Sequence, residues 1–194
     1  MPPHEFLSPT ATPRENNSVL MVATANRFFS EDECRQVVNL SEQQAQIAGT
    51  VGDNREQSTA RNSRVKFLLP DSSTEWIFRK LNAAIRRLNE AYQYQLSGFE
   101  ALQVATYTVG DHYDWHIDLG PGKNSTRKLS LSLQLSDSSE YEGGDLEFMN
   151  IDRKSSREVG ALITFPAFLT HRVTPVTRGA RKSLVAWING DPFR

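Results

Sequence analysis

The sequence predicts a mainly β protein of the α+β class, with N-terminal helices that brace an all-β barrel or jelly roll. Two segments before residue 98 carry apolar residues every three to four positions, which is the period of an amphipathic helix. After Gly98 the chain reads as short strands separated by turns rich in Gly, Ser and Asp, as in barrels and jelly rolls. The length of 194 residues is enough for one domain with a buried core.

The composition excludes several classes of protein. A formal net charge of −1 argues against binding of nucleic acid through bulk electrostatics. The single cysteine, Cys34, excludes an internal disulfide framework and a cysteine-rich zinc site, and it fits a reducing compartment. No apolar run approaches the roughly 20 residues of a membrane span, and the N-terminus lacks the apolar region of a signal peptide. We therefore expect a cytoplasmic protein with no membrane partner, whose oligomeric state the sequence leaves open.

The chain is expected to consist of a flexible part and a folded part. Residues 1–18 are predicted to be a flexible tail, because four of the nine prolines fall within the first 13 residues. Residues 19–194 are predicted to form a single domain, with a helical brace over about 19–97 and a β core over about 98–194.

Within the brace, a strand in 18–29 is expected to lead into a helix that starts at Ser30. Glu33 follows three residues later and completes a capping-box pattern. A polar loop over 49–64 and a short apolar strand over 65–70 come next. A second helix is predicted from Ser73 to about Tyr94, because its apolar residues recur at helical spacing.

The β core is predicted to contain eight strands, and one of them alternates strictly between apolar and polar residues. In KLSLSLQLS (128–136), we expect the four leucines to share one face, and the small polar residues to lie where helices approach the outside of the sheet. The eight predicted strands are 99–108, 112–118, 128–136, 144–150, 157–160, 161–167, 171–176 and 181–188.

The stretch HYDWHID (112–118) contains two overlapping His-x-Asp pairs, His112/Asp114 and His116/Asp118. Residues two apart on a strand point to the same side, so either pair could offer two ligands to one metal. His171, at the start of a later strand, would complete a 2-His-1-carboxylate triad, which is typical of non-haem Fe(II) oxygenases. Zinc remains an alternative for this ligand set, although a hydrolytic zinc site also needs a nearby general base.

Two residues are candidates for binding an anion beside the metal. Arg181 begins a predicted barrel strand, where a buried guanidinium is costly unless it meets an anion. It could clamp a ligand carboxylate in a bidentate manner, or it could be an exposed residue at the strand end. Tyr107 could donate its hydroxyl to the same anion, or it could be a buried structural tyrosine.

The chain resembles the prolyl 4-hydroxylase-like family of Fe(II)- and 2-oxoglutarate-dependent oxygenases, which are built on a double-stranded β-helix. The resemblance is close over about 100–190 and looser at STARNSRV (58–65). The segments that carry it are YTVGDHYDWHID (107–118), RKLSLSLQLS (127–136), EGGDLEF (142–148), FPAFLTHRVTPV (165–176) and GARKSLVAW (179–187).

The resemblance implies that 19–194 is a dioxygenase domain and assigns roles within it. It places Fe(II) on His116, Asp118 and His171, and the distal carboxylate of 2-oxoglutarate on Arg181, with Tyr107 lining that pocket. Ascorbate is implied as a possible reductant. Six further residues are candidates for lining the site, because of the resemblance or because of their position. They are Trp187, Leu133, His112, Asp114, Arg61 and Ser63.

One position departs from the family pattern. Some relatives place a tyrosine on the third barrel strand to contact the cosubstrate, where this chain is expected to have Leu133. Gln134 or Arg127 would contribute only with a different register. His112 and Asp114 are then expected at the mouth of the site, either lining the approach to the metal or facing water.

The activity implied by the resemblance is hydroxylation coupled to the conversion of 2-oxoglutarate and O₂ into succinate and CO₂. A prolyl residue in a peptide or protein is the expected substrate, with a free amino acid or another small molecule as the alternative. A cupin-like metal-binding module without oxygenase activity is the alternative from another class. Two polar loops, 49–64 with Arg55, Arg61 and Arg64, and 119–127, are expected to flank the pocket as recognition loops or to be solvated surface loops.

Overall fold

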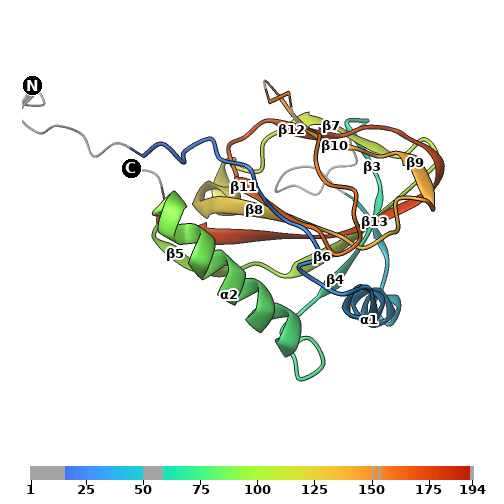
Figure 1. The fold of residues 1–194 in the computed structure, drawn as a ribbon, viewed down its shortest axis with the longest axis horizontal. Coiled ribbons are helices and arrows are strands. Elements are labelled where there is room, and N and C mark those ends of the chain that lie inside the picture. Colours follow the sequence, from blue (N-terminus) through green and yellow to red (C-terminus); the bar gives the residue numbers. More distant parts are fainter. Residues whose placement is uncertain (1–15, 50–58, 150, 153, 193–194) are drawn as a thin grey trace, which may run out of the picture.

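The computed structural model describes residues 16–49, 59–149, 151–152 and 154–192, and Figure 1 shows their arrangement. In chain order the elements are β1 (Ala23–Ala25), α1 (Glu31–Glu42), β2 (Ile47–Ala48), β3 (Arg61–Asn62), β4 (Arg64–Leu68), α2 (Glu75–Tyr92), β5 (Leu96–Phe99), β6 (Leu102–Thr108), β7 (His112–His116), η1 (Gly122–Thr126), β8 (Arg127–Gln134), β9 (Tyr141–Gly143), β10 (Leu146–Phe148), β11 (Leu162–Pro166), β12 (His171–Val173) and β13 (Val176–Gly190).

The strands form two antiparallel sheets, which confirms the predicted mainly β fold with a jelly-roll core. The larger sheet has nine strands in the order β1-β11-β8-β13-β6-β4-β2, with β5 and β9 paired to β13 off this path. The smaller sheet has the order β10-β12-β7-β3. In Figure 1 the smaller sheet lies on the opposite side of the large sheet from the two helices.

Both predicted helices are present and cover the outer face of the large sheet. At the start of α1, Ser30 and Glu33 form the expected reciprocal capping box. Along α2, residues Ile77, Leu81 and Ile85 are buried in one apolar cluster with leucines of β8. The helices therefore stabilise the barrel by burying one of its outer faces. No helix in the described ranges is long and apolar enough to cross a bilayer.

The prediction for the two faces of β8 is wrong. Leu129, Leu131 and Leu133 are fully buried in the cluster that contains the helices, so the leucine face is the one that packs against the brace. Ser130 and Ser132 face the barrel interior, where Ser130 bonds to a side chain of the functional site. Both faces of this strand are buried, and the alternation alone does not show which face packs against the helices and which faces the barrel interior.

The brace region contains β1 and β4, close to the two strands predicted there, and it also contributes two short strands that were not predicted, β2 and β3. The expected loop over 49–64 therefore ends earlier, at β3. The predicted strand over 157–160 is a turn instead. There Gly160 has a φ of +77°, and a Cβ on it would lie 1.9 Å from the Phe29 carbonyl oxygen.

Most of the expected N-terminal tail lies outside the described residues. Its last part is described and contacts α2, because the Asn16 amide donates to the Tyr92 carbonyl at 2.8 Å. The Tyr92 hydroxyl in turn donates to the carbonyls of Met21 and Thr164.

Candidate metal centre

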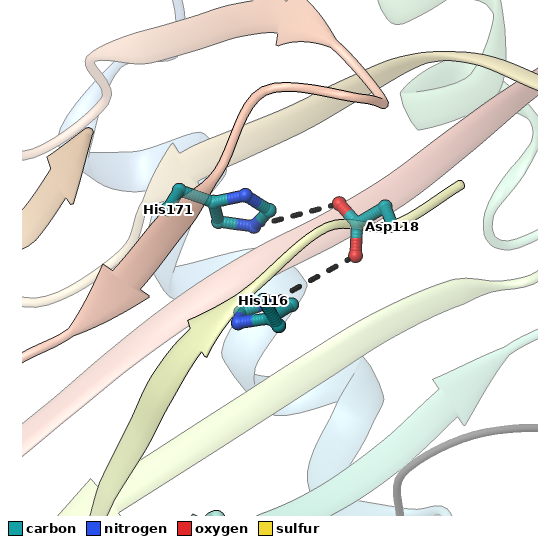
Figure 2. Close-up of side chains that lie close together, drawn as sticks. All are labelled: His116, Asp118 and His171. Carbon is teal, nitrogen blue, oxygen red and sulfur yellow. Dashed lines mark ion pairs between the residues drawn. The ribbon is translucent and has the colours of Figure 1, made fainter. Parts of the chain in front are cut away.

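Two side chains from one short segment and a third from more than fifty residues later in the chain meet between the two sheets. His116 ends β7, Asp118 lies two residues later in the following loop, and His171 begins β12 directly opposite His116. One ligand atom from each lies within 4.8 Å of the others, and this is the only such group found among the described residues (Figure 2). The Asp118 carboxylate lies 3.8 Å from His116 Nε2 and 3.5 Å from His171 Nε2. This set can hold one metal ion on a single face.

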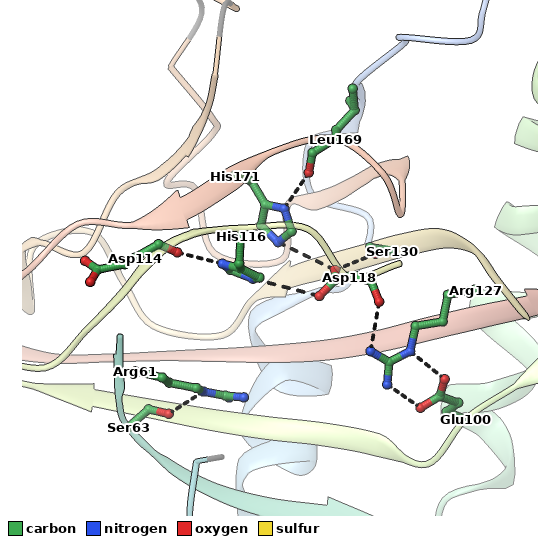
Figure 3. A network of polar contacts seen from close by, with 10 residues as sticks. All are labelled: Arg61, Ser63, Glu100, Asp114, His116, Asp118, Arg127, Ser130, Leu169 and His171. Carbon is green, nitrogen blue, oxygen red and sulfur yellow. Dashed lines mark hydrogen bonds and ion pairs between the residues drawn. The ribbon is translucent and has the colours of Figure 1, made fainter. Parts of the chain in front are cut away.

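Hydrogen bonds from outside the triad orient all three ligands (Figure 3). His116 Nδ1 lies 2.7 Å from the Asp114 carbonyl, and His171 Nδ1 lies 2.8 Å from the Leu169 carbonyl. A carbonyl can only accept, so each Nδ1 carries the proton and each Nε2 keeps its lone pair toward the metal position. The Ser130 hydroxyl donates to Asp118 Oδ2 at 2.6 Å.

The ionisation of the triad suits metal binding. Burial, together with the neighbouring His171, lowers the pKa of His116 to about 4, so its imidazole is neutral near pH 7. Burial alone would raise the pKa of Asp118, but His171, His116 and the Ser130 hydroxyl hold that pKa below its usual range. A neutral imidazole and an ionised carboxylate are the forms that bind a metal ion.

A β-bulge separates the two His-x-Asp pairs. Two residues on β7 lie between Tyr113 and His116, while only one residue on β12 lies between their partners Val173 and His171. Tyr113 therefore shares the inner face with His116, and their rings stack with centroids 3.4 Å apart. Regular alternation would place positions 112, 114, 116 and 118 on one face of the strand, and the bulge breaks this pattern. The space around His116, Asp118 and His171 is a cavity, here called the metal cavity, with a groove beside it. Neither His112 nor Asp114 lines the cavity or the groove.

One end of the metal cavity is suited to an anion. Arg181 is 4% exposed, lines the cavity, and has no carboxylate within ion-pair distance among the described residues. Its guanidinium lies 5.8 Å from the ring of Tyr107, which is the residue paired with it on β6. The buried hydroxyl of Ser183 also lines the cavity and lacks a hydrogen-bond partner in the described part of the chain. A carboxylate there would satisfy these groups.

The Gly143-Gly144 turn makes room for this end of the cavity. Gly144 has a φ of +63°, and a Cβ on it would lie 3.1 Å from Cδ of Arg181. A larger residue would therefore strain the backbone and displace the arginine.

Trp187 lines both the metal cavity and the groove beside it, and Arg127 lines the groove next to Trp187. The guanidinium of Arg127 lies 4.0 Å from the Trp187 ring, donates to the Asp118 carbonyl at 3.3 Å, and pairs with both carboxylate oxygens of Glu100 (Figure 3). The Trp187 indole nitrogen is buried without a hydrogen-bond partner among the described residues. Arg127 thus holds the Asp118 loop and the indole in place, and it does not point at the anion end.

The remaining predicted residues divide into two groups. Arg61 lines the cavity, with its guanidinium 4.8 Å from the Tyr113 ring and its Nε donating to Ser63 at 2.9 Å. By contrast, Leu133 is not among the residues that line the cavity and is buried in the cluster under the helices, so the expectation that it lines the site is wrong. The side-chain amide of Gln134 donates a hydrogen bond to the Tyr141 hydroxyl.

The two expected loops have different outcomes. Loop 119–127, with η1 inside it, lines a groove that opens from the metal cavity, so it flanks the site as expected. Arg55 lies outside the described residues. Arg64 faces Thr108 and Asp111, away from the metal.

Sequence reasoning missed several lining residues. Ser183 could have been found from the alternation of β13, because positions 181, 183, 185 and 187 all line the cavity. Tyr113 could not have been found in this way, because only the bulge turns it inward. The cavity lining contains no carboxylate or imidazole other than the three ligands, so the general base expected of a hydrolytic zinc site is missing there.

Comparison with known proteins agrees with this geometry. Residues 102–189 match the model of the 2OG-Fe(II) oxygenase superfamily. A PKHD-type hydroxylase of Synechococcus sp. (strain CC9902) is 38% identical over 92 residues, which cover 45% of this chain and 40% of that protein. The chain thus spans about two fifths of the length of that relative.

Solved structures share the fold at low sequence identity. A Pseudomonas putida prolyl-4-hydroxylase has a TM-score of 0.73 at 18% identity, covering 90% of this chain and 95% of its own. A Trichoplax adhaerens prolyl hydroxylase, in complex with a hypoxia inducible factor oxygen degradation domain peptide fragment, has a TM-score of 0.72 at 21% identity, covering 87% and 83%. The chain is therefore similar to the 2OG-Fe(II) oxygenase superfamily over residues 102–189, and it shares its fold with solved prolyl hydroxylases.

Proposed function

We propose that this chain is an Fe(II)- and 2-oxoglutarate-dependent dioxygenase that hydroxylates a prolyl residue in a peptide or protein and releases succinate and CO₂. One observation carries the proposal. A 2-His-1-carboxylate triad shares its cavity with Arg181, a buried cation that lacks an acidic partner among the described residues. A metal-binding module without a cosubstrate would gain nothing from that buried charge.

The donor set fits Fe(II), because two imidazoles and one carboxylate on a single face leave positions open for a cosubstrate and O₂. In this proposal His116, Asp118 and His171 hold the metal. Bound Fe(II) with 2-oxoglutarate would supply the oxygen activation and the decarboxylation.

The other residues would act by binding and positioning. Arg181 and Ser183 would bind the distal carboxylate of 2-oxoglutarate, with Tyr107 beside it. Ser130 keeps the Asp118 carboxylate in place by donating to one of its oxygens. The apolar wall of the cavity, including Phe165, would limit the access of water to the metal.

Anaerobic titration tests the proposal directly. Protein loaded with Fe(II) should develop a visible absorption band when 2-oxoglutarate is added, and Arg181→Ala should need far more 2-oxoglutarate for the same band. The proposal fails if no band forms, or if the affinity of the variant for 2-oxoglutarate equals that of the wild type. A zinc hydrolase or a cupin-like module would give neither result.

The substrate is tested by a screen of prolyl peptides, free amino acids and other small metabolites for the gain of one oxygen atom that depends on 2-oxoglutarate. The peptide complex of the Trichoplax relative supports the choice of a peptide. Hydroxylation of a free amino acid alone would favour the alternative. The proposal also includes ascorbate as reductant and a cytoplasmic location, and the buried free thiol of Cys34 is compatible with a reducing compartment.

A further inference from the structure

A groove opens from the metal cavity and is much larger than the cavity itself. Its volume is about 540 Å³, against about 40 Å³ for the metal cavity. The two adjoin each other, because five residues line both: Arg61, Gln103, Tyr113, Asp118 and Trp187. A cosubstrate bound at the anion end would leave this groove open.

Part of the groove is lined by apolar side chains that are exposed to solvent. Three of the eight large apolar residues that are exposed in the described ranges line the groove: Leu69 (63% exposed), Ile117 (48%) and Ile47 (43%). With Phe67, which lies on the same wall, we call these residues the apolar shelf. Such a cluster beside a reactive centre is typical of a binding surface.

The position of Ile117 ties the shelf to the reacting atoms. This residue lies between the ligands His116 and Asp118, and its side chain lines the groove but not the metal cavity. A group that contacts Ile117 is therefore a neighbour of the group that faces the metal.

The charged side chains that line the groove are Arg61, Lys123, Arg127, Glu100 and Asp118. None of them belongs to the apolar shelf, so the shelf itself suits a neutral side chain. The Glu100 carboxylate is held by both nitrogens of the Arg127 fork, so this ion pair offers little net charge to a ligand. The other carboxylate in the lining is Asp118, which belongs to the triad.

We propose that the groove binds an extended peptide, and that the apolar shelf takes an apolar side chain next to the residue that is hydroxylated. The inference rests on the proposed function and narrows its substrate class. A free amino acid placed next to the metal position would leave the shelf exposed to water. A peptide with a leucine at the right neighbouring position buries that surface in addition.

The test uses the full chain loaded with Fe(II) and 2-oxoglutarate, and a set of otherwise identical prolyl peptides. Each peptide carries Leu, Ser, Glu or Lys at one position beside the proline, and the hydroxylated product is measured by mass spectrometry. At one of the positions tested beside the proline, the Leu peptide should have a kcat/KM about tenfold higher than that of the Ser peptide, mainly because its KM is lower. Free proline should be a poorer substrate than the Leu peptide.

Variants of the shelf then show which surface reads the peptide. Leu69→Ser should reduce the Leu-to-Ser ratio of kcat/KM toward one, and Leu69→Lys should favour the Glu peptide by about threefold over wild type. Using a ratio within each variant removes any change in overall activity. Val109→Ser is the matched control, because Val109 is 64% exposed and lines neither the cavity nor the groove, so its ratio should stay at the wild-type value.

The outcomes separate this inference from the proposed function. If succinate forms from 2-oxoglutarate but no peptide reacts, or flanking residues have no effect, or Leu69→Ser leaves the ratio unchanged, the inference is wrong and the oxygenase chemistry stands. If the protein forms no succinate from 2-oxoglutarate under any condition, the proposed function fails and the inference fails with it.

Discussion

Replacement of Arg181 by Gln should separate the affinity for 2-oxoglutarate from the stability of the fold. The guanidinium is 4% exposed, and no carboxylate among the described residues pairs with it, so its partner in the proposed complex is the ligand. Loss of one member of a buried charged pair costs about 2–5 kcal/mol. This corresponds to a dissociation constant for 2-oxoglutarate that rises by roughly 30-fold to several thousand-fold.

The ligand-free protein should respond differently. An unpaired buried cation is costly, so its removal should leave the free energy of unfolding unchanged or raised, apart from the contact with the Tyr107 ring, worth about 0.5–2 kcal/mol. A ligand at 100 times its dissociation constant stabilises the wild type by about 2.7 kcal/mol, and Arg181→Gln should lose most of this gain.

Two measurements check both halves of this prediction. Anaerobic calorimetry with Fe(II) and 2-oxoglutarate gives the affinity, and thermal unfolding with and without 2-oxoglutarate gives the stability. Arg181→Lys is the matched variant, because it keeps the charge and loses the planar fork, so its affinity should be intermediate. The reasoning is refuted if Arg181→Gln unfolds more easily without ligand while its affinity for 2-oxoglutarate is unchanged.

Three further predictions concern the triad, the strand register and the cysteine. His116→Ala should weaken metal binding more than about 100-fold, and His112→Ala should leave it nearly unchanged, as measured by metal content and calorimetry; the reverse result would contradict the bulged register. Leu133→Ala should lower the free energy of unfolding by about 2–5 kcal/mol in denaturant titrations without changing the affinity for 2-oxoglutarate, and a loss of affinity at full stability would place this side chain in the site. Burial, with the charge of Glu33, raises the pKa of the Cys34 thiol to about 11, so only about one thiol in a thousand is ionised at pH 8. Native protein should then resist alkylation that the unfolded chain undergoes, and fast labelling of native protein would show that the thiol is accessible.

Much of the fold was predictable because its signals are local. The capping box at Ser30 and Glu33 and the helical spacing of Ile77, Leu81 and Ile85 depend on neighbours a few residues away. The candidate metal ligands were also predictable as residue types, because two residues of one short motif and one later histidine supply all three donor atoms. The spacing alone left two His-x-Asp pairs open, and the resemblance to a family chose between them.

The sequence by itself determined which elements form and which side chains can bind a metal or an anion. The tertiary structure alone decided how those side chains face. The bulge in β7 turns Tyr113 inward and His112 away, and it depends on pairing with β12, more than fifty residues later in the chain. In the same way, the alternation of β8 fits either orientation of its two faces. Only the position of the helices decides that Leu133 packs under the brace while Ser130 donates to Asp118.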